Sequence, residues 1–268
     1  MEETIPVTTE LAFEVRNLTK RFGSNTVVDD LSLGVPRGSI YGIVGPNGAG
    51  KTTMLGMATG LIRPTAGEAY ICGRNTWTDP LEAKRRMGLV VDGLPVFDRL
   101  TGGELLEYVG ALRGLRRADI ATRSTELLDA LGLTEARNKQ VVDYSAGMTK
   151  KILLATALIH NPELLVLDEP LEAVDPVSGE IIQKILRAFA AAGGTVVLSS
   201  HVMSLVEGLC DHVAIIDHGK VLLAGHVDDI RDGKTFTEVF VECVGGGDFN
   251  EDSLRWLSGR THESGSES

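Results

Sequence analysis

Residues 45–53 read GPNGAGKTT, and they lie between an apolar run at 39–44 (SIYGIV) and a stretch of helical character from Lys51 to about Leu61. The segment satisfies the pattern G-x-x-x-x-G-K-[ST], which arises by chance in about one percent of chains of this length. An apolar strand that enters the loop and a helix that leaves it are the context in which this pattern binds phosphate. The segment therefore predicts a phosphate-binding loop, with an ordinary glycine-rich turn as the alternative.

The chemistry of phosphate binding explains why these residue types occur at this spacing. Glycine lets backbone N–H groups turn inward around phosphate oxygens, where a Cβ would collide, and the following helix directs its positive N-terminal end at the same oxygens. Lys51 can reach the β- and γ-phosphates of a nucleotide, and the Thr52 hydroxyl can bind Mg²⁺. The residues expected to contact the nucleotide here are Gly45, Pro46, Asn47, Gly48, Ala49, Gly50, Lys51, Thr52 and Thr53.

A pair of carboxylates follows the apolar run LLVL at 164–167. In nucleotide sites of this kind the first acid, here Asp168, holds Mg²⁺ through its waters, and the adjacent Glu169 is free to orient and deprotonate an attacking water. Such an acid favours hydrolysis over transfer to an acceptor. A solvated turn or a helix cap is the alternative for a lone Asp-Glu pair. The guanine-specifying N-K-x-D sequence is missing, because NKQV at 138–141 lacks the acid, and this disfavours a GTPase.

Short β-like runs alternate with helical stretches along the chain, which is typical of a mainly parallel sheet with helical crossovers. Runs at 13–22 and 27–35 precede the loop and predict an N-terminal antiparallel β-subdomain. From about 93 to 160 the pattern changes to successive helices, which we interpret as a helical insertion. We therefore predict an α/β fold with a RecA-like P-loop NTPase core over residues 1–240, followed at 241–268 by a polar tail expected to be flexible.

The composition limits the partners that the chain can have. It has 268 residues, 43% of them hydrophobic, and a formal net charge of −11, which argues against general attraction to nucleic acid. The three cysteines are far apart and show no CxxC spacing, so a reducing compartment fits better than a disulfide framework or a zinc site. The start, MEETIPVTTE, does not resemble a signal peptide, and the longest apolar run, ILLATALI at 152–159, is shorter than the roughly 20 residues that span a bilayer. We expect neither a transmembrane segment nor a nucleic-acid partner.

Residues 144–148 read YSAGM, just before a predicted helix and about 20 residues ahead of the acid pair. Together with the phosphate loop and the acids, in this order, the segment resembles the signature of the nucleotide-binding subunit of ABC transporters. The resemblance covers about residues 11–230. It implies that Ser145 and Gly147 bind the γ-phosphate of ATP held by the opposite subunit, through a hydroxyl and N–H groups at a helix N-terminus. Standing alone, the segment would be an ordinary serine N-cap near a glycine.

Three further residues match positions of the same family. AVDP at 173–176 resembles the D-loop, which implies that Asp175 lies at the subunit contact, although an aspartate cap before proline is also an ordinary helix start. His201 ends the run TVVLSSH, where the family has a histidine that contacts the γ-phosphate. Phe22 matches the aromatic residue that stacks on adenine, with a core phenylalanine of the first hairpin as the alternative.

The sequence also departs from the family pattern. Asp92 stands where the Q-loop normally has Gln or Glu, and we expect it to bind Mg²⁺ through a water rather than directly, or else to lie in a solvated loop. In the signature, Tyr144, Ala146 and Met148 replace the usual Leu, first Gly and Gln. The D-loop is preceded by Leu-Glu-Ala at 171–173, where Thr, Asn or Ser, and Gly are common. These changes concern the details of the subunit contact.

The resemblance implies an ATPase that works with Mg²⁺ and drives transport through a separate permease. Two copies, or this chain and a paralogous cassette, would meet head to tail on ATP, and the chain would sit at the cytoplasmic face of the membrane through its integral membrane partner. The segment VFDRLTGGELLEYVGALRGL at 96–115 most resembles the subfamily that drives drug and polysaccharide exporters. The alternatives are an ABC-type ATPase that acts on nucleic acid or the ribosome, and a weakly active regulatory cassette.

Overall fold

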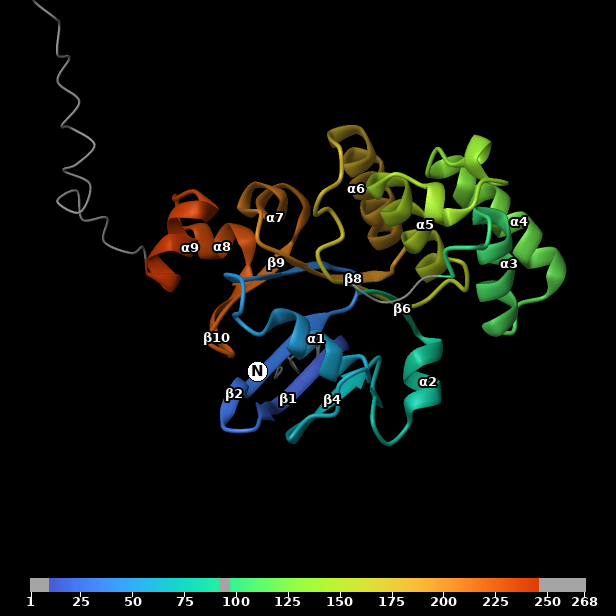
Figure 1. Ribbon diagram of the computed structural model, residues 1–268. Coiled ribbons are helices and arrows are strands. Elements are labelled where there is room, and N and C mark those ends of the chain that lie inside the picture. Colours follow the sequence, from blue (N-terminus) through green and yellow to red (C-terminus); the bar gives the residue numbers. More distant parts are fainter. Residues whose placement is uncertain (1–9, 92–96, 246–268) are drawn as a thin grey trace, which may run out of the picture.

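The computed structural model describes residues 10–91 and 97–245. Two sheets form its framework, with helices against both faces of the larger one (Figure 1). The smaller sheet is antiparallel, with its strands in the order β2 (Asn25–Pro36), β1 (Leu11–Phe22), β4 (Ala66–Ile71), β5 (Arg74–Asn75). This is the predicted N-terminal β-subdomain.

The larger sheet carries the phosphate loop at the end of one of its central strands. Its order is β10 (Lys220–His226), β9 (His212–Asp217), β3 (Ile40–Val44), β8 (Thr195–Ser200), β7 (Leu164–Leu167), β6 (Met87–Val90). All neighbouring strands are parallel except β10, which pairs antiparallel to β9. The predicted α/β class with a mainly parallel sheet is confirmed.

The helices fall into groups along the chain. The described helices are α1 (Lys51–Ala58), α2 (Pro80–Arg85), α3 (Gly102–Leu112), α4 (Arg117–Ala130), α5 (Ala146–Leu158), α6 (Pro176–Ala191), α7 (Met203–Leu209), α8 (Val227–Arg231) and α9 (Phe236–Val244), with 3₁₀ turns at Thr134–Ala136 and Val141–Asp143. Helices α3, α4 and α5 gather at one end of the large sheet, whereas α8 and α9 lie at the other end (Figure 1).

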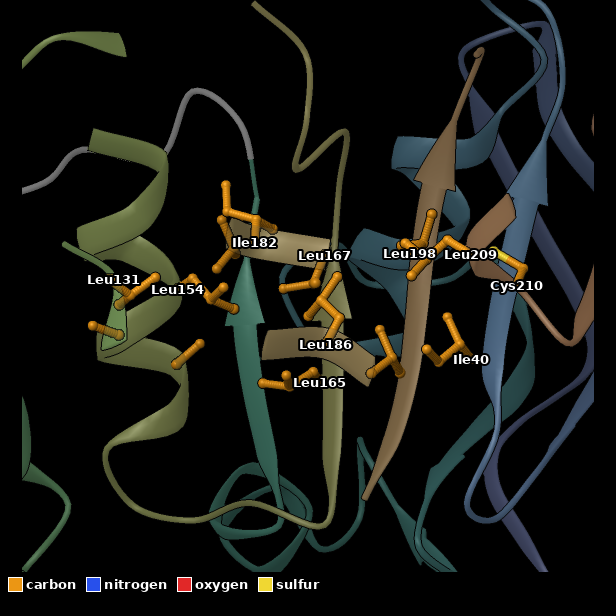
Figure 2. Packing of buried hydrophobic residues seen from close by; sticks show 14 of the residues in the cluster. Ile40, Leu131, Leu154, Leu165, Leu167, Ile182, Leu186, Leu198, Leu209 and Cys210 are labelled. Atoms are coloured by element: carbon orange, nitrogen blue, oxygen red, sulfur yellow. The ribbon is translucent and has the colours of Figure 1, made fainter. Parts of the chain in front are cut away.

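The alternation of side chains along the central strands separates two buried clusters. On β7, Leu164 and Val166 face α1 and the small sheet, while Leu165 and Leu167 face the opposite helices. Figure 2 shows this second cluster, in which Leu165, Leu167 and Leu198 of the sheet pack with Ile182 and Leu186 of α6. Burial on both faces explains why these strands read as continuous apolar runs.

Some element ends differ from the predicted ones. Helix α1 ends at Ala58 and not near Leu61, because Gly60 takes a φ of +80° and the N–H groups of Leu61 and Ile62 both donate to the Gly56 carbonyl. At the other end of the chain, α9 continues four residues past position 240, to Val244, and buries Phe236 and Val239. In the part of the chain that the structure describes, no helix has the length and apolar character needed to cross a membrane.

Candidate nucleotide-binding site

The phosphate loop leaves β3 and enters α1 at a helix N-terminus that no side chain caps. Gly50 precedes the helix with a φ of +100°, a conformation that L side chains rarely adopt. Gly45 has no room for a side chain, since a Cβ there would lie 2.1 Å from the Ile216 carbonyl oxygen of β9. The first N–H groups of α1 are therefore open to a ligand, with the positive end of the helix behind them.

Lys51 folds back onto its own loop. Its Nζ donates to the carbonyl oxygens of Gly45 at 2.6 Å and Pro46 at 3.2 Å, and the residue is buried. Burial lowers the pKa of Lys51, an effect opposed by the nearby carboxylates of Glu169 and Asp168. An ammonium group held by two carbonyls beside a helix N-terminus is placed to bind phosphate oxygens.

The two predicted acids lie just after β7, beside the end of β8. Asp168 is buried, and its Oδ1 accepts a hydrogen bond from the Ser199 hydroxyl at 2.5 Å. The same hydroxyl accepts the Glu169 N–H at 2.9 Å. One serine side chain of β8 thus fixes both acids relative to each other.

Glu169 combines a strained backbone with several contacts. Its φ is +45°, in the left-handed region that is uncommon for residues other than glycine. Its carboxylate lies 3.1 Å from Nδ1 of His201, and its carbonyl accepts from Nζ of Lys150 at 3.2 Å. The carboxylate is thereby directed toward the end of β8, where the sequence placed the histidine.

A pocket of about 220 Å³ brings these elements together. Its lining residues are Val27, Asn47, Gly48, Ala49, Gly50, Lys51, Thr52, Thr53, Glu169, Glu172 and His201. The loop residues from Asn47 to Thr53 thus share one cavity with Glu169 and His201, while Asp168 is buried and lies outside the lining.

Other predicted residues lie outside the lining of this pocket and contact one another. Ser145 caps α5 by accepting the Met148 N–H at 3.3 Å, and Asp175 caps α6 by accepting the Ser178 N–H at 2.9 Å, which lowers the pKa of Asp175. Gly147 is pressed against α6, because a Cβ would lie 2.8 Å from Oδ2 of Asp175 and 2.9 Å from the Ser178 hydroxyl. The N-termini of α5 and α6 therefore form a second, continuous surface.

The remaining predicted residues have separate positions. Phe22 ends β1 with 51% of its surface exposed, so the core alternative is excluded, and Nζ of Lys20 lies 4.8 Å from its ring centre. Asp92 lies outside the described residues.

Sequence reasoning missed three residues of the site: Ser199, Val27 and Glu172. Ser199 was visible as a polar residue at the end of the apolar run TVVLSS, and such a position at the carboxyl end of a parallel strand is a signal for a site residue. Val27 and Glu172 carry no comparable signal, because only the fold brings them beside the loop.

A strand, a glycine loop and a helix with a buried lysine, next to two carboxylates at the end of a neighbouring parallel strand, define a P-loop nucleotide hydrolase. The family model described as ABC transporter matches residues 28–172, and the chain belongs to that family.

Relatives and solved structures agree with this assignment. The chain is 37% identical to the daunorubicin/doxorubicin resistance ATP-binding protein of Streptomyces peucetius, covering 82% of this chain and 67% of that protein. It is 37% identical to the Nod factor export ATP-binding protein I of Cupriavidus pinatubonensis, covering 97% and 80%. A solved ATP-binding subunit of an ABC transporter superposes with a TM-score of 0.81 at 28% identity, covering 87% of this chain and 99% of that one.

The chain is accordingly an ATP-binding subunit whose ATP hydrolysis powers an ABC transporter. The relatives named above do not favour the alternatives of a non-transport ATPase or a weakly active regulatory cassette.

Proposed function

We propose that two copies of this chain bind ATP and Mg²⁺ head to tail, and that hydrolysis drives export of a small molecule through a separate permease at the cytoplasmic face of the membrane. Each ATP would lie between the phosphate loop of one copy and the Ser145–Gly147 segment of the other. The direction of transport is inferred from relatives named for drug resistance and Nod factor export.

The main support for a dimer is that the predicted ATP-binding residues of one chain lie on two separate surfaces. The pocket gathers Lys51, Glu169 and His201, while Ser145 and Gly147 lie at the N-terminus of α5 outside its lining. A helix N-terminus with a serine hydroxyl binds phosphate well. Two chains in opposite orientation would let this second surface cover the open pocket of its partner.

The donor atoms near the loop fit a magnesium ion. Thr52 lines the pocket and Asp168 is buried outside its lining, and hydroxyl and carboxylate oxygens are the ligands that Mg²⁺ prefers. No group of three or more His, Cys, Asp or Glu side chains suited to a metal occurs within 10–91 and 97–245. This agrees with an ion that shares its remaining ligands with phosphates and water. When bound, Mg²⁺ would neutralise phosphate charge.

The chain's own residues supply the chemistry of hydrolysis. Lys51 would exchange its two carbonyl partners for phosphate oxygens when the nucleotide enters. The Glu169 carboxylate would take a proton from the attacking water, and His201, 3.1 Å from that carboxylate, would hold it in position. Phe22, exposed at the end of β1, would stack on the adenine.

A second pocket, of about 450 Å³, fits the membrane partner. Its lining residues, from α2, β6 and the end of α3 with the turn after α1, are Thr59, Leu61, Leu81, Lys84, Arg85, Met87, Leu89, Leu112, Arg113 and Gly114. Leu81 is 61% and Leu112 is 73% exposed, which is unusual for leucine side chains grouped around one hollow. A short cytoplasmic helix of the permease, apolar on one side and acidic beside Lys84 and Arg85, would fill it.

Replacing Glu169 by glutamine tests the proposal. The Glu169→Gln chain should bind ATP, form ATP-dependent dimers in light scattering and hydrolyse ATP at least about 100-fold more slowly, because the general base is lost. Glu180→Gln is the matched control, since it removes an exposed carboxylate on α6 that does not line the pocket and should leave the rate near that of the wild type. Full activity of Glu169→Gln would remove Glu169 as the base.

Mixing two inactive variants tests the head-to-tail arrangement separately. Lys51→Ala disables the phosphate loop, and Ser145→Arg disables the opposite surface. In a mixed dimer one composite site is intact, so mixing the two chains should restore part of the hydrolysis. Two monomeric sites would give no restoration.

A further inference from the structure

The turn between β9 and β10 is hydrogen-bonded to the phosphate loop. It consists of His218 and Gly219, and the Gly219 N–H donates to the carbonyl oxygen of Ala49 at 2.9 Å. On its other side, the Gly219 carbonyl accepts the N–H of Asp29 in β2 at 3.0 Å. The turn thus joins the loop to the small sheet, and β10 lies beside β2 in Figure 1.

This hydrogen bond fixes the direction of a phosphate-binding group. The peptide between Ala49 and Gly50 is planar and trans, so its C=O and N–H point in opposite directions. Because the carbonyl is held toward Gly219, the Gly50 N–H points away from the turn. Gly50 lines the nucleotide pocket, and no acceptor among the described residues takes its N–H.

The approach of the turn to β2, on the side away from its hydrogen bond to the loop, leaves no space for a side chain. A Cβ on Gly219 would lie 2.4 Å from the Val27 carbonyl oxygen and 2.8 Å from the Val28 Cα. Both of these atoms belong to backbone, which cannot move aside as the end of a flexible side chain can. An ion pair between Lys220 and Asp29, at 3.1 Å, joins the same two segments at the surface.

We propose that Gly219 is a positioning residue for the phosphate loop, which aims the Gly50 N–H at the β-phosphate of the bound nucleotide. The close backbone contact holds the Ala49–Gly50 peptide in this orientation before ATP arrives. The turn therefore belongs to the nucleotide site although it lies about 170 residues from the loop in sequence and lines no part of the pocket. The inference rests on nucleotide binding at the loop.

The chain contains a matched control for this role. The turn between β4 and β5 has the same length and backbone shape: Cys72 and Gly73 have φ values of +47° and +74°, against +47° and +76° for His218 and Gly219. A Cβ on Gly73, however, meets nothing within 4 Å. Alanine at either glycine produces the same left-handed strain, but only at Gly219 does it press on the segment that holds the loop.

The test measures dissociation constants of the full-length variants for MgATP and MgADP by titration calorimetry, together with their thermal stability. Gly219→Ala should weaken both nucleotides about tenfold, as expected for the loss of one well-aimed hydrogen bond to a charged group. Gly73→Ala should lose stability and keep wild-type affinity. Gly219→Asn should bind as poorly as Gly219→Ala, because asparagine tolerates the backbone angle but retains the Cβ.

The outcomes separate the inference from the proposed function. Wild-type affinity of Gly219→Ala, or an equal loss in Gly73→Ala, would overturn the positioning role alone. A wild-type chain that binds no nucleotide would overturn both. If Gly219→Ala does not fold, Asp29→Ala removes the exposed ion pair without adding a Cβ; a two- to threefold weaker affinity supports the role, and unchanged affinity contradicts it.

Discussion

Replacing Ser199 by alanine should disable the site without touching a predicted catalytic group. The Ser199 side chain is fully buried and joins the Asp168 carboxylate, at 2.5 Å, to the Glu169 N–H, at 2.9 Å. Alanine removes only the hydroxyl, so both acids remain but lose their common partner. The left-handed backbone of Glu169 also loses one of the contacts that hold it.

The magnitude follows from the two lost hydrogen bonds. A bond to a charged carboxylate contributes about 1.5–3 kcal/mol to stability, and an N–H left without a partner costs about 1 kcal/mol or more. The free energy of unfolding should therefore fall by about 3 kcal/mol. The neighbouring Ser200 provides the control: it is equally buried and accepts one backbone N–H, that of Val202, at 3.0 Å. Ser200→Ala should cost about 1 kcal/mol.

Two assays check this difference. By thermal unfolding, Ser199→Ala should melt roughly 4–8 °C below Ser200→Ala, since 1 kcal/mol corresponds to about 2–4 °C in a domain of this size. The ATPase kcat of Ser199→Ala should fall about 100-fold, because small displacements of catalytic groups have large effects on rate. Equal melting temperatures and equal rates for the two alanine variants would refute the bridging role of Ser199.

Three other predictions concern stability and the partner. Ala173 has a φ of +56°, so Ala173→Gly should raise the free energy of unfolding in urea by about 1 kcal/mol, and a loss of stability would contradict this. Burial lowers the pKa of His160 to about 4, so the unfolded chain takes up a proton first as the pH falls below 6.5. The contribution of neutral His160 to the free energy of unfolding is therefore complete above pH 6.5 and is lost as the pH falls from 6.5 to 4. His160→Gln should reduce the pH dependence of the free energy of unfolding, measured in urea, over this range. An unchanged pH dependence would exclude His160 as its cause. Leu112→Glu should abolish co-purification with the permease and leave ATP affinity unchanged, whereas retained co-purification would place the partner elsewhere.

The sequence was sufficient for the parts of the fold and site that depend on neighbouring residues. The glycine loop, the helix after it and the Asp168–Glu169 pair are each encoded within a few positions, and apolar runs buried on both faces marked the central strands. The end of α1 was misplaced because a Gly60 turn, and not the loss of apolar residues, stops the helix.

What could not be predicted depends on contacts between distant segments. Ser199 acts through β8 lying beside β7, and Gly219 acts through a turn that lies between the phosphate loop and β2. The sequence around Ser199 and Gly219 does not indicate which distant segment each residue contacts. The left-handed conformation of Glu169 was also beyond prediction, since a non-glycine residue takes it only where surrounding contacts hold it there.

These contacts also connect the two surfaces that one chain would contribute to the proposed dimer. Lys150 lies in the second turn of α5, after the Ser145–Gly147 segment, and donates to the Glu169 carbonyl. Gly147 packs against Asp175 at the start of α6 with no room for a Cβ, so the N-termini of the two helices are in tight contact. A γ-phosphate bound by Ser145 would thus act, through α5, on the backbone of the Glu169 that belongs to the other nucleotide. The two ATP sites of such a dimer are therefore expected to hydrolyse interdependently.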